Sequence, residues 1–151
     1  MKRFEFPLQT ILELREREED AAKAFLMSQE QEWVKIHGEF NSKKEELQDF
    51  QRREKENRIS ADSASELRFS VSWRNTLKFD LLKLGQQLQD ISLDVERAKK
   101  KLTEATIKRK SLEMLKDKKK SEWQKEFNKN EQKFLDELAQ SRKKGDNSQY
   151  T

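Results

Sequence analysis

LKFDLLKLGQQLQDISLDVERAKKKLTEA, residues 77–105, carries the strongest pattern in this sequence. Steps of alternately four and three residues from Leu77 reach an apolar residue every time. An apolar residue about every 3.5 positions forms the a/d seam of a coiled coil. The stretch therefore predicts a long helix that buries one narrow stripe against a partner helix. The seam positions are Leu77, Leu81, Leu84, Leu88, Ile91, Val95, Ala98, Leu102 and Ala105.

A second seam lies in the N-terminal third of the chain. It follows the same four-three spacing from Leu8 to Phe50, with four polar interruptions. It predicts a second helix able to pair with the first. Its positions are Leu8, Leu12, Arg15, Glu19, Ala22, Leu26, Gln29, Trp33, Ile36, Phe40, Lys43, Leu47 and Phe50.

The two seams are separated by a break at residues 56–66. Ser63 and Glu66 fit a capping box that begins a helix. Pro7 suits a first helical turn, and Lys143 to Gly145 is typical of a helix end. These signals predict helices at about 7–56 and 64–143, a turn at about 57–63 and a frayed tail at 144–151.

A short turn between two amphipathic helices makes them antiparallel neighbours. We therefore predict an all-α fold, a long antiparallel two-helix coiled-coil hairpin. It would be rod-shaped, with the second helix longer than the first, in a single domain spanning 1–151. In this register, facing residues have numbers that sum to about 120. The chain beyond about residue 115 would then overhang the first helix.

The overhang carries an apolar stripe of Trp123, Phe127, Phe134 and Leu138. One alternative is that the stripe packs on the N-terminal tail, where Phe4 and Phe6 could reach it. The other is a docking face for another protein, because exposed aromatic patches usually mark an interface. We favour the docking face.

Composition limits the function. The chain is 41% charged and 32% hydrophobic, with one Pro, three Gly, one His and no Cys. Few turn-forming residues argue against many-stranded folds, and a thin seam offers no cavity for an active site. We expect no enzyme activity, no catalytic residue, no metal, no cofactor and no small-molecule substrate. We also expect no transmembrane segment and no signal peptide, hence a cytoplasmic protein.

Residues 97–120 hold eleven Lys or Arg and three acids. Nucleic acid or an anionic membrane surface could bind such a run. The run lies on a heptad helix without interleaved aromatics, so we favour a solvated or partner-facing coiled-coil surface and expect no nucleic acid. Gly38 and Gly85 are expected to be tolerated surface positions, with room beside Trp33 and Phe40 as the alternative. His37 is expected to face water and to carry no chemistry.

Several segments resemble the FliJ family, a soluble component of the flagellar type III export apparatus. They cover nearly the whole chain. They are residues 4–15 (FEFPLQTILELR) with Glu18-Glu19 and Ala21-Ala22, 95–105 (VERAKKKLTEA), 110–119 (KSLEMLKDKK) and 130–139 (NEQKFLDELA).

The resemblance implies a stalk-like antiparallel coiled coil whose partners are the flagellar export ATPase ring, the cytoplasmic domain of the export gate membrane protein, and export chaperones. It implies a protein associated peripherally with the inner face of the cell membrane at the flagellar base. The expected ATPase-end residues are Phe4, Phe6, Leu8, Arg15, Lys116, Trp123, Phe127 and Phe134. The expected gate-end residues are Phe40, Leu47, Phe50 and Trp73.

Three alternatives stay open. The chain could be the stalk protein of an injectisome, which shares the same shape. It could be a basic adaptor that binds nucleic acid or anionic membrane through residues 97–120. It could also be a homodimeric coiled coil in which the second helix pairs with itself.

Overall fold

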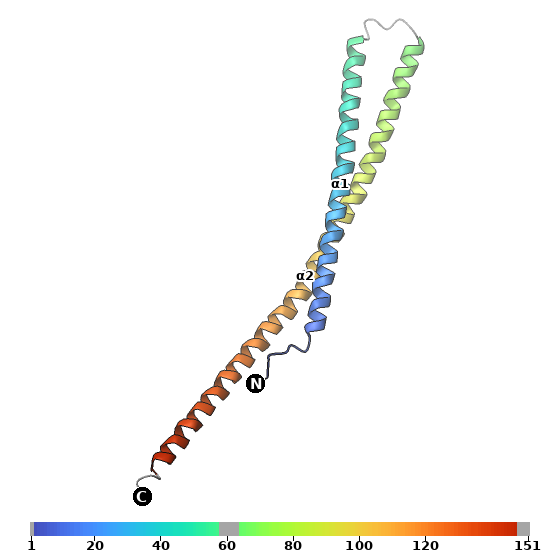
Figure 1. Ribbon diagram of the computed structural model, residues 1–151. Coiled ribbons are helices and arrows are strands. Elements are labelled where there is room, and N and C mark those ends of the chain that lie inside the picture. Colours follow the sequence, from blue (N-terminus) through green and yellow to red (C-terminus); the bar gives the residue numbers. More distant parts are fainter. Residues whose placement is uncertain (1, 58–63, 148–151) are drawn as a thin grey trace. The chain divides into compact units, whose positions relative to one another are not determined.

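Two long helices account for nearly all of the structure, a computed structural model that describes residues 2–57 and 64–147 (Figure 1). Helix α1 spans Gln9–Asn57 and helix α2 spans Ala64–Asn147, with 49 and 84 residues. No strand occurs in the described residues. The predicted all-α hairpin with a longer second helix is confirmed.

Helix α1 begins after a turn that contains Pro7. The Gln9 amide donates to the Phe6 carbonyl at 3.0 Å, and the Leu12 amide donates to the Leu8 carbonyl at 2.9 Å. Pro7 has no amide hydrogen, so its place in this turn leaves no donor unpaired. At the start of α2, the predicted capping box includes Ser63, which lies outside the described residues.

Helix α2 continues past Lys143, where the sequence pattern predicted its end, to Asn147. Gly145 lies inside the helix, and no glycine among the described residues has a positive φ. A glycine costs a helix about 1 kcal/mol relative to alanine, but it does not forbid helical geometry. Lys144 in the last turn interacts favourably with the carbonyl end of the helix dipole.

Contacts divide the chain into two compact units. The first unit consists of Met1–Glu18 and Thr106–Thr151, and the second consists of Glu19–Ala105. In the second unit, α1 and α2 meet along the predicted seams. Leu77, Ile91 and Ala98 are buried there. The other seam positions from Ala22 to Phe50 and from Leu81 to Ala105 are half-buried, as expected for a stripe between only two helices.

The first unit has a smaller core. Phe6 and Leu12 are buried, and Leu8 and Arg15 are half-buried. On α2, the half-buried positions include Arg109, Leu112, Lys116, Trp123 and Phe127. Long basic side chains can cover apolar surface with their methylene stems while the charge stays in water. The α2 seam therefore continues beyond Ala105 through Arg109 and Lys116.

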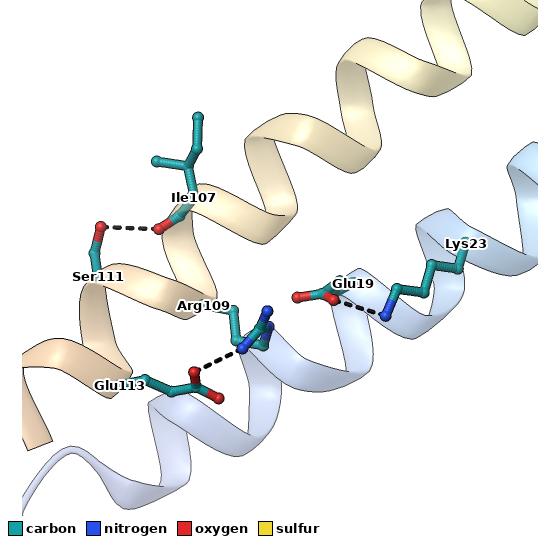
Figure 2. A network of polar contacts seen from close by, with 6 residues as sticks. All are labelled: Glu19, Lys23, Ile107, Arg109, Ser111 and Glu113. Atoms are coloured by element: carbon teal, nitrogen blue, oxygen red, sulfur yellow. Dashed lines mark hydrogen bonds and ion pairs between the residues drawn. The ribbon is translucent and has the colours of Figure 1, made fainter. Parts of the chain in front are cut away.

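Two charged seam positions, Glu19 and Arg109, have ion-pair partners in their own helices (Figure 2). Glu19 in α1 is 4% exposed, and its carboxylate lies 2.8 Å from the Lys23 ammonium group. In α2, the Arg109 guanidinium lies 2.7 Å from the Glu113 carboxylate, and Ser111 donates to the Ile107 carbonyl. These pairs compensate part of the cost of placing charge at seam positions.

The register differs from the prediction in each unit. A sum of about 120 would place Trp33 opposite Gln87, but the Trp33 indole donates to the Ser92 hydroxyl at 3.0 Å. Likewise, Gln9 contacts Lys116 instead of Ser111. Side chains lean toward the N-terminus of their own helix. In an antiparallel pair, the numbers of two residues in contact therefore have a larger sum than the numbers of two residues at the same height. The predicted sum of about 120 did not include this difference.

Trp33 connects the two helices of the second unit. Ser92 accepts the indole N–H and itself donates to the Leu88 carbonyl at 2.7 Å. The Trp33 ring also stacks on His37, with centroids 4.6 Å apart and planes 13° apart. His37 is therefore half-buried against the Trp33 ring. The sequence-based expectation that His37 faces water is corrected by this contact.

Replacing Ser92 with alanine is expected to lower the free energy of unfolding by about 1 kcal/mol, because the Trp33 N–H loses its partner. Ser28→Ala is the matched control, since the exposed Ser28 hydroxyl bonds only the Phe25 carbonyl of its own helix among the contacts described. Urea unfolding followed by circular dichroism measures both variants. Equal effects would show that the interhelical bond contributes nothing.

Alanine is expected to stabilise the chain at both seam-region glycines by up to about 1 kcal/mol each. A Cβ at Gly38 meets nothing within 4 Å, and a Cβ at Gly85 would lie 3.6 Å from the Phe40 ring, an ordinary contact. Thermal unfolding of Gly38→Ala and Gly85→Ala measures the gain. A lower melting temperature for Gly85→Ala alone would mean that the glycine makes room for Phe40.

Candidate docking surface

The N-terminal tail packs on α2 within the first unit. Phe6 is only 8% exposed, and its carbonyl accepts the Gln9 amide. The Gln9 side-chain oxygen accepts a hydrogen bond from the Lys116 ammonium group at 2.8 Å. Farther along α2, the Phe4 ring lies 6.0 Å from the Trp123 ring at an interplanar angle of 54°. The Phe4 ring thus brings the tail to Trp123, while Phe6 and Gln9 hold the start of α1.

A groove lies on α2 next to this tail. Trp123 and Phe127 stack with centroids 5.2 Å apart, because residues four apart share one helix face. The groove has a volume of about 590 Å³. It combines aromatic and aliphatic walls with a few polar groups. Its lining residues are Lys2, Trp123, Glu126, Phe127, Asn130, Glu131, Phe134 and Leu135.

The far part of the stripe is exposed. Phe134, Leu135 and Leu138 are 62%, 58% and 46% exposed, and every other residue from 128 to 147 is exposed as well. The alternative in which the N-terminal tail packs on the stripe therefore holds only at Trp123, and the docking face stays a prediction. Phe4 covers an edge of Trp123, whereas Phe134 and Leu138 stay open to solvent. An open row of large apolar side chains is typical of an interaction surface.

The structure brings together four of the predicted ATPase-end residues, namely Phe4, Trp123, Phe127 and Phe134. Lys116 is nearby in sequence but bonds Gln9. Other predicted residues have packing roles. Phe6 is buried, Leu8 is half-buried in the seam, and Arg15 pairs with Glu18 at 2.9 Å.

Sequence reasoning missed Leu135, Glu126 and Glu131, which also line the groove. Leu135 lies eight residues after Phe127, a helical spacing that brings the two close to one face. That spacing could have identified it. Glu126 and Glu131 follow no sequence pattern that would have identified them, apart from their positions beside the stripe.

The predicted gate-end residues lie in the second unit. Phe40, Leu47 and Phe50 are half-buried seam residues, and Trp73 is 38% exposed. The more exposed apolar side chains of this unit lie off the seam, among them Phe69, Phe79 and Leu82 at 70%, 65% and 75%. The seam-based choice therefore selected packing residues, because a/d positions face the partner helix. Nothing in the structure tests their contact with a partner.

The basic segment 97–120 carries several partners of its own. Arg97 lies 3.4 Å from Asp94, and Lys119 lies 3.5 Å from Glu122. The Lys101 ammonium group sits 5.8 Å from the centre of the Phe25 ring. Arg97 and Lys119 thus pair with acids of their own helix, and Lys101 lies over an aromatic ring of α1.

Two features are absent from the part of the chain that the structure describes, residues 2–57 and 64–147. No helix there contains an apolar stretch long enough to cross a membrane. No group of three or more His, Asp or Glu side chains there is arranged to hold a metal ion.

The comparison with family models matches residues 4–147 to the family described as flagellar FliJ protein. The match covers both helices and the tail residues that contact Trp123. No curated protein and no solved structure matches the chain.

The structure predicts different effects for two aromatic truncations. Phe6→Ala is expected to destabilise the first unit by about 3 kcal/mol, because a buried phenylalanine is lost. Phe134→Ala is expected to change the free energy of unfolding by less than about 0.5 kcal/mol, because the ring is already exposed. Urea unfolding measures the first effect and hydrogen exchange at the Gln9 amide localises it. Comparable losses for both variants would contradict the exposed position of Phe134.

Proposed function

Because this chain belongs to the FliJ family and is a non-enzymatic component of the flagellar export apparatus, we propose that it acts as the stalk that binds the export ATPase ring. The observation that supports this role most directly is the open apolar stripe on α2. Phe127, Phe134 and Leu138 follow one helix face, and Phe134 is 62% exposed. A partner that buries them would gain the apolar area that this chain leaves in water.

The proposed contact with the ring uses the first unit. Trp123, Phe127 and Phe134 form its apolar centre, and Phe4 lies at the edge of that centre next to Trp123. Leu8, Arg15 and Lys116 would lie at its margin, and Phe6 would hold the tail in place. Aromatic residues surrounded by polar ones are the usual composition of an interface centre.

The second unit is proposed to approach the cytoplasmic domain of the export gate through the region of Phe40, Leu47, Phe50 and Trp73. Since Phe40, Leu47 and Phe50 stabilise the helix pair, a direct contact would involve Trp73 and the exposed Phe69, which lies four residues before it on the same helix face. Export chaperones would be further partners of the same coiled coil. An asymmetric helix pair inside a ring would favour closure of some subunits over others, and contact with the gate would pass this bias on.

The family also gives the proposed location, on the cytoplasmic side of the cell membrane at the flagellar base. The chain would be held there by its protein partners. The matched family is the flagellar one, which favours this system over the injectisome alternative.

The docking face is tested with Phe127→Ala combined with Phe134→Ala. We expect at least a tenfold loss of affinity for the export ATPase. Truncating an aromatic side chain that is a hot spot at the centre of an interface costs roughly 2 kcal/mol or more. Surface plasmon resonance with immobilised ATPase measures the affinity, and circular dichroism confirms the helix content.

A matched control removes two apolar side chains from the same unit but away from the groove. Ile107 and Met114 are 59% and 72% exposed and do not line it. Ile107→Ala with Met114→Ala should leave ATPase binding unchanged. If the control variant loses as much affinity as the test variant, the ATPase ring does not bind through the aromatic stripe.

A further inference from the structure

The groove beside Trp123 is locally acidic in a chain that carries a net charge of +4. Glu126 and Glu131 line it together with the aromatic walls. The only cation in its lining is Lys2, which comes from the N-terminal tail. Carboxylates beside an apolar wall favour a ligand that carries positive charge next to apolar side chains.

The chain's own tail is an example of such a ligand. Lys2 and Arg3 are basic and are followed directly by Phe4, whose ring contacts Trp123. Lys2 lines the same groove as Glu126 and Glu131. The tail therefore places a cation and an aromatic ring where the groove offers carboxylates and an aromatic wall.

Of the tail residues, the groove lining includes Lys2 alone among those described. Phe134 and Leu135 line the same groove and are still 62% and 58% exposed. A longer segment with the same chemistry could bury the remaining side chains.

We propose that the groove binds a basic protein segment with aromatic or aliphatic anchors, which displaces Lys2 and Phe4 and extends over Phe134 and Leu135. This names the chemistry of the partner at the docking face, and so it rests on the proposed function. Burial of the apolar anchors supplies most of the affinity. The exposed carboxylates contribute little energy and mainly select for positive charge.

The test uses the full chain and two fluorescein-labelled amphipathic peptides. One contains Leu, Phe and Lys, and its twin has every Lys replaced by Glu. Fluorescence anisotropy measures both affinities at low and high salt. We expect the Lys peptide to bind at least about tenfold more tightly than its twin, with a preference that shrinks as salt rises. Equal binding of the two peptides would overturn the proposal.

Variants locate the binding site. Glu126→Gln with Glu131→Gln should weaken the Lys peptide by about fivefold, and Phe134→Ala by about tenfold. Asp136→Asn is the charge control, because this acid is exposed on the same helix and does not line the groove. An unchanged affinity in the glutamine pair, or an equal loss in Asp136→Asn, would place the peptide elsewhere and contradict the proposal.

Phe4→Ala tests the displacement. If the tail competes with the peptide, this variant binds the Lys peptide more tightly than the unmodified chain. Weaker binding would show that Phe4 is part of the wall and would overturn the displacement. Sedimentation equilibrium adds a second outcome. A dimer that disappears in Phe4→Ala would assign the groove to the tail of a second copy instead of a different protein.

The peptide assay contains no ATPase, so the two proposals can fail separately. Selective peptide binding without ATPase binding would reject the proposed function and keep the groove chemistry. ATPase binding through Phe134 without selection for the Lys peptide would keep the proposed function and reject the proposed groove chemistry.

Discussion

The narrow apolar seam between α1 and α2 is the constraint on which the other features depend. A helix pair can bury only the side chains that face the partner, which is why most seam residues are half-buried and the buried ones among the described residues of the second unit are Glu19, Leu77, Ile91 and Ala98. Everything else on both helices meets solvent. The high charge content is the direct result, because a long two-helix structure has far more outer surface than seam.

A thin seam also makes individual polar groups important for specificity. Trp33 and Ser92 join the helices by one hydrogen bond at 3.0 Å, and Arg74 lies 3.3 Å from Glu54 across the same unit. Apolar seams tolerate sliding by a heptad, because each layer resembles the next. Single polar pairs oppose such sliding, since every shifted register would separate them. The seam supplies the stability of the pair, and these contacts select its register.

The four-three spacing predicted the helix pair and the seam positions with few errors, because burial in a coiled coil follows directly from periodicity. It failed where geometry beyond periodicity decides. The facing partner of Trp33 was misplaced because side chains lean along the helix, and α2 passed through Gly145 because a glycine only weakens a helix. The stripe at Trp123, Phe127 and Phe134 was predictable as well. The groove acids were not, since an exposed glutamate has no sequence pattern to distinguish it.

The solvent-exposed end of α2 has a further consequence. Residues 128–147 are helical although all of them are exposed. An isolated peptide of that length would be marginally helical, because starting a helix is costly while extending one is not. This segment extends a helix whose nucleus is already formed at Leu77–Ala105, so it avoids the initiation cost. Its order then decays one residue at a time toward Asn147 instead of being lost in a single step. A binding partner would therefore have to supply only the small free energy of helix propagation for each residue that it keeps helical.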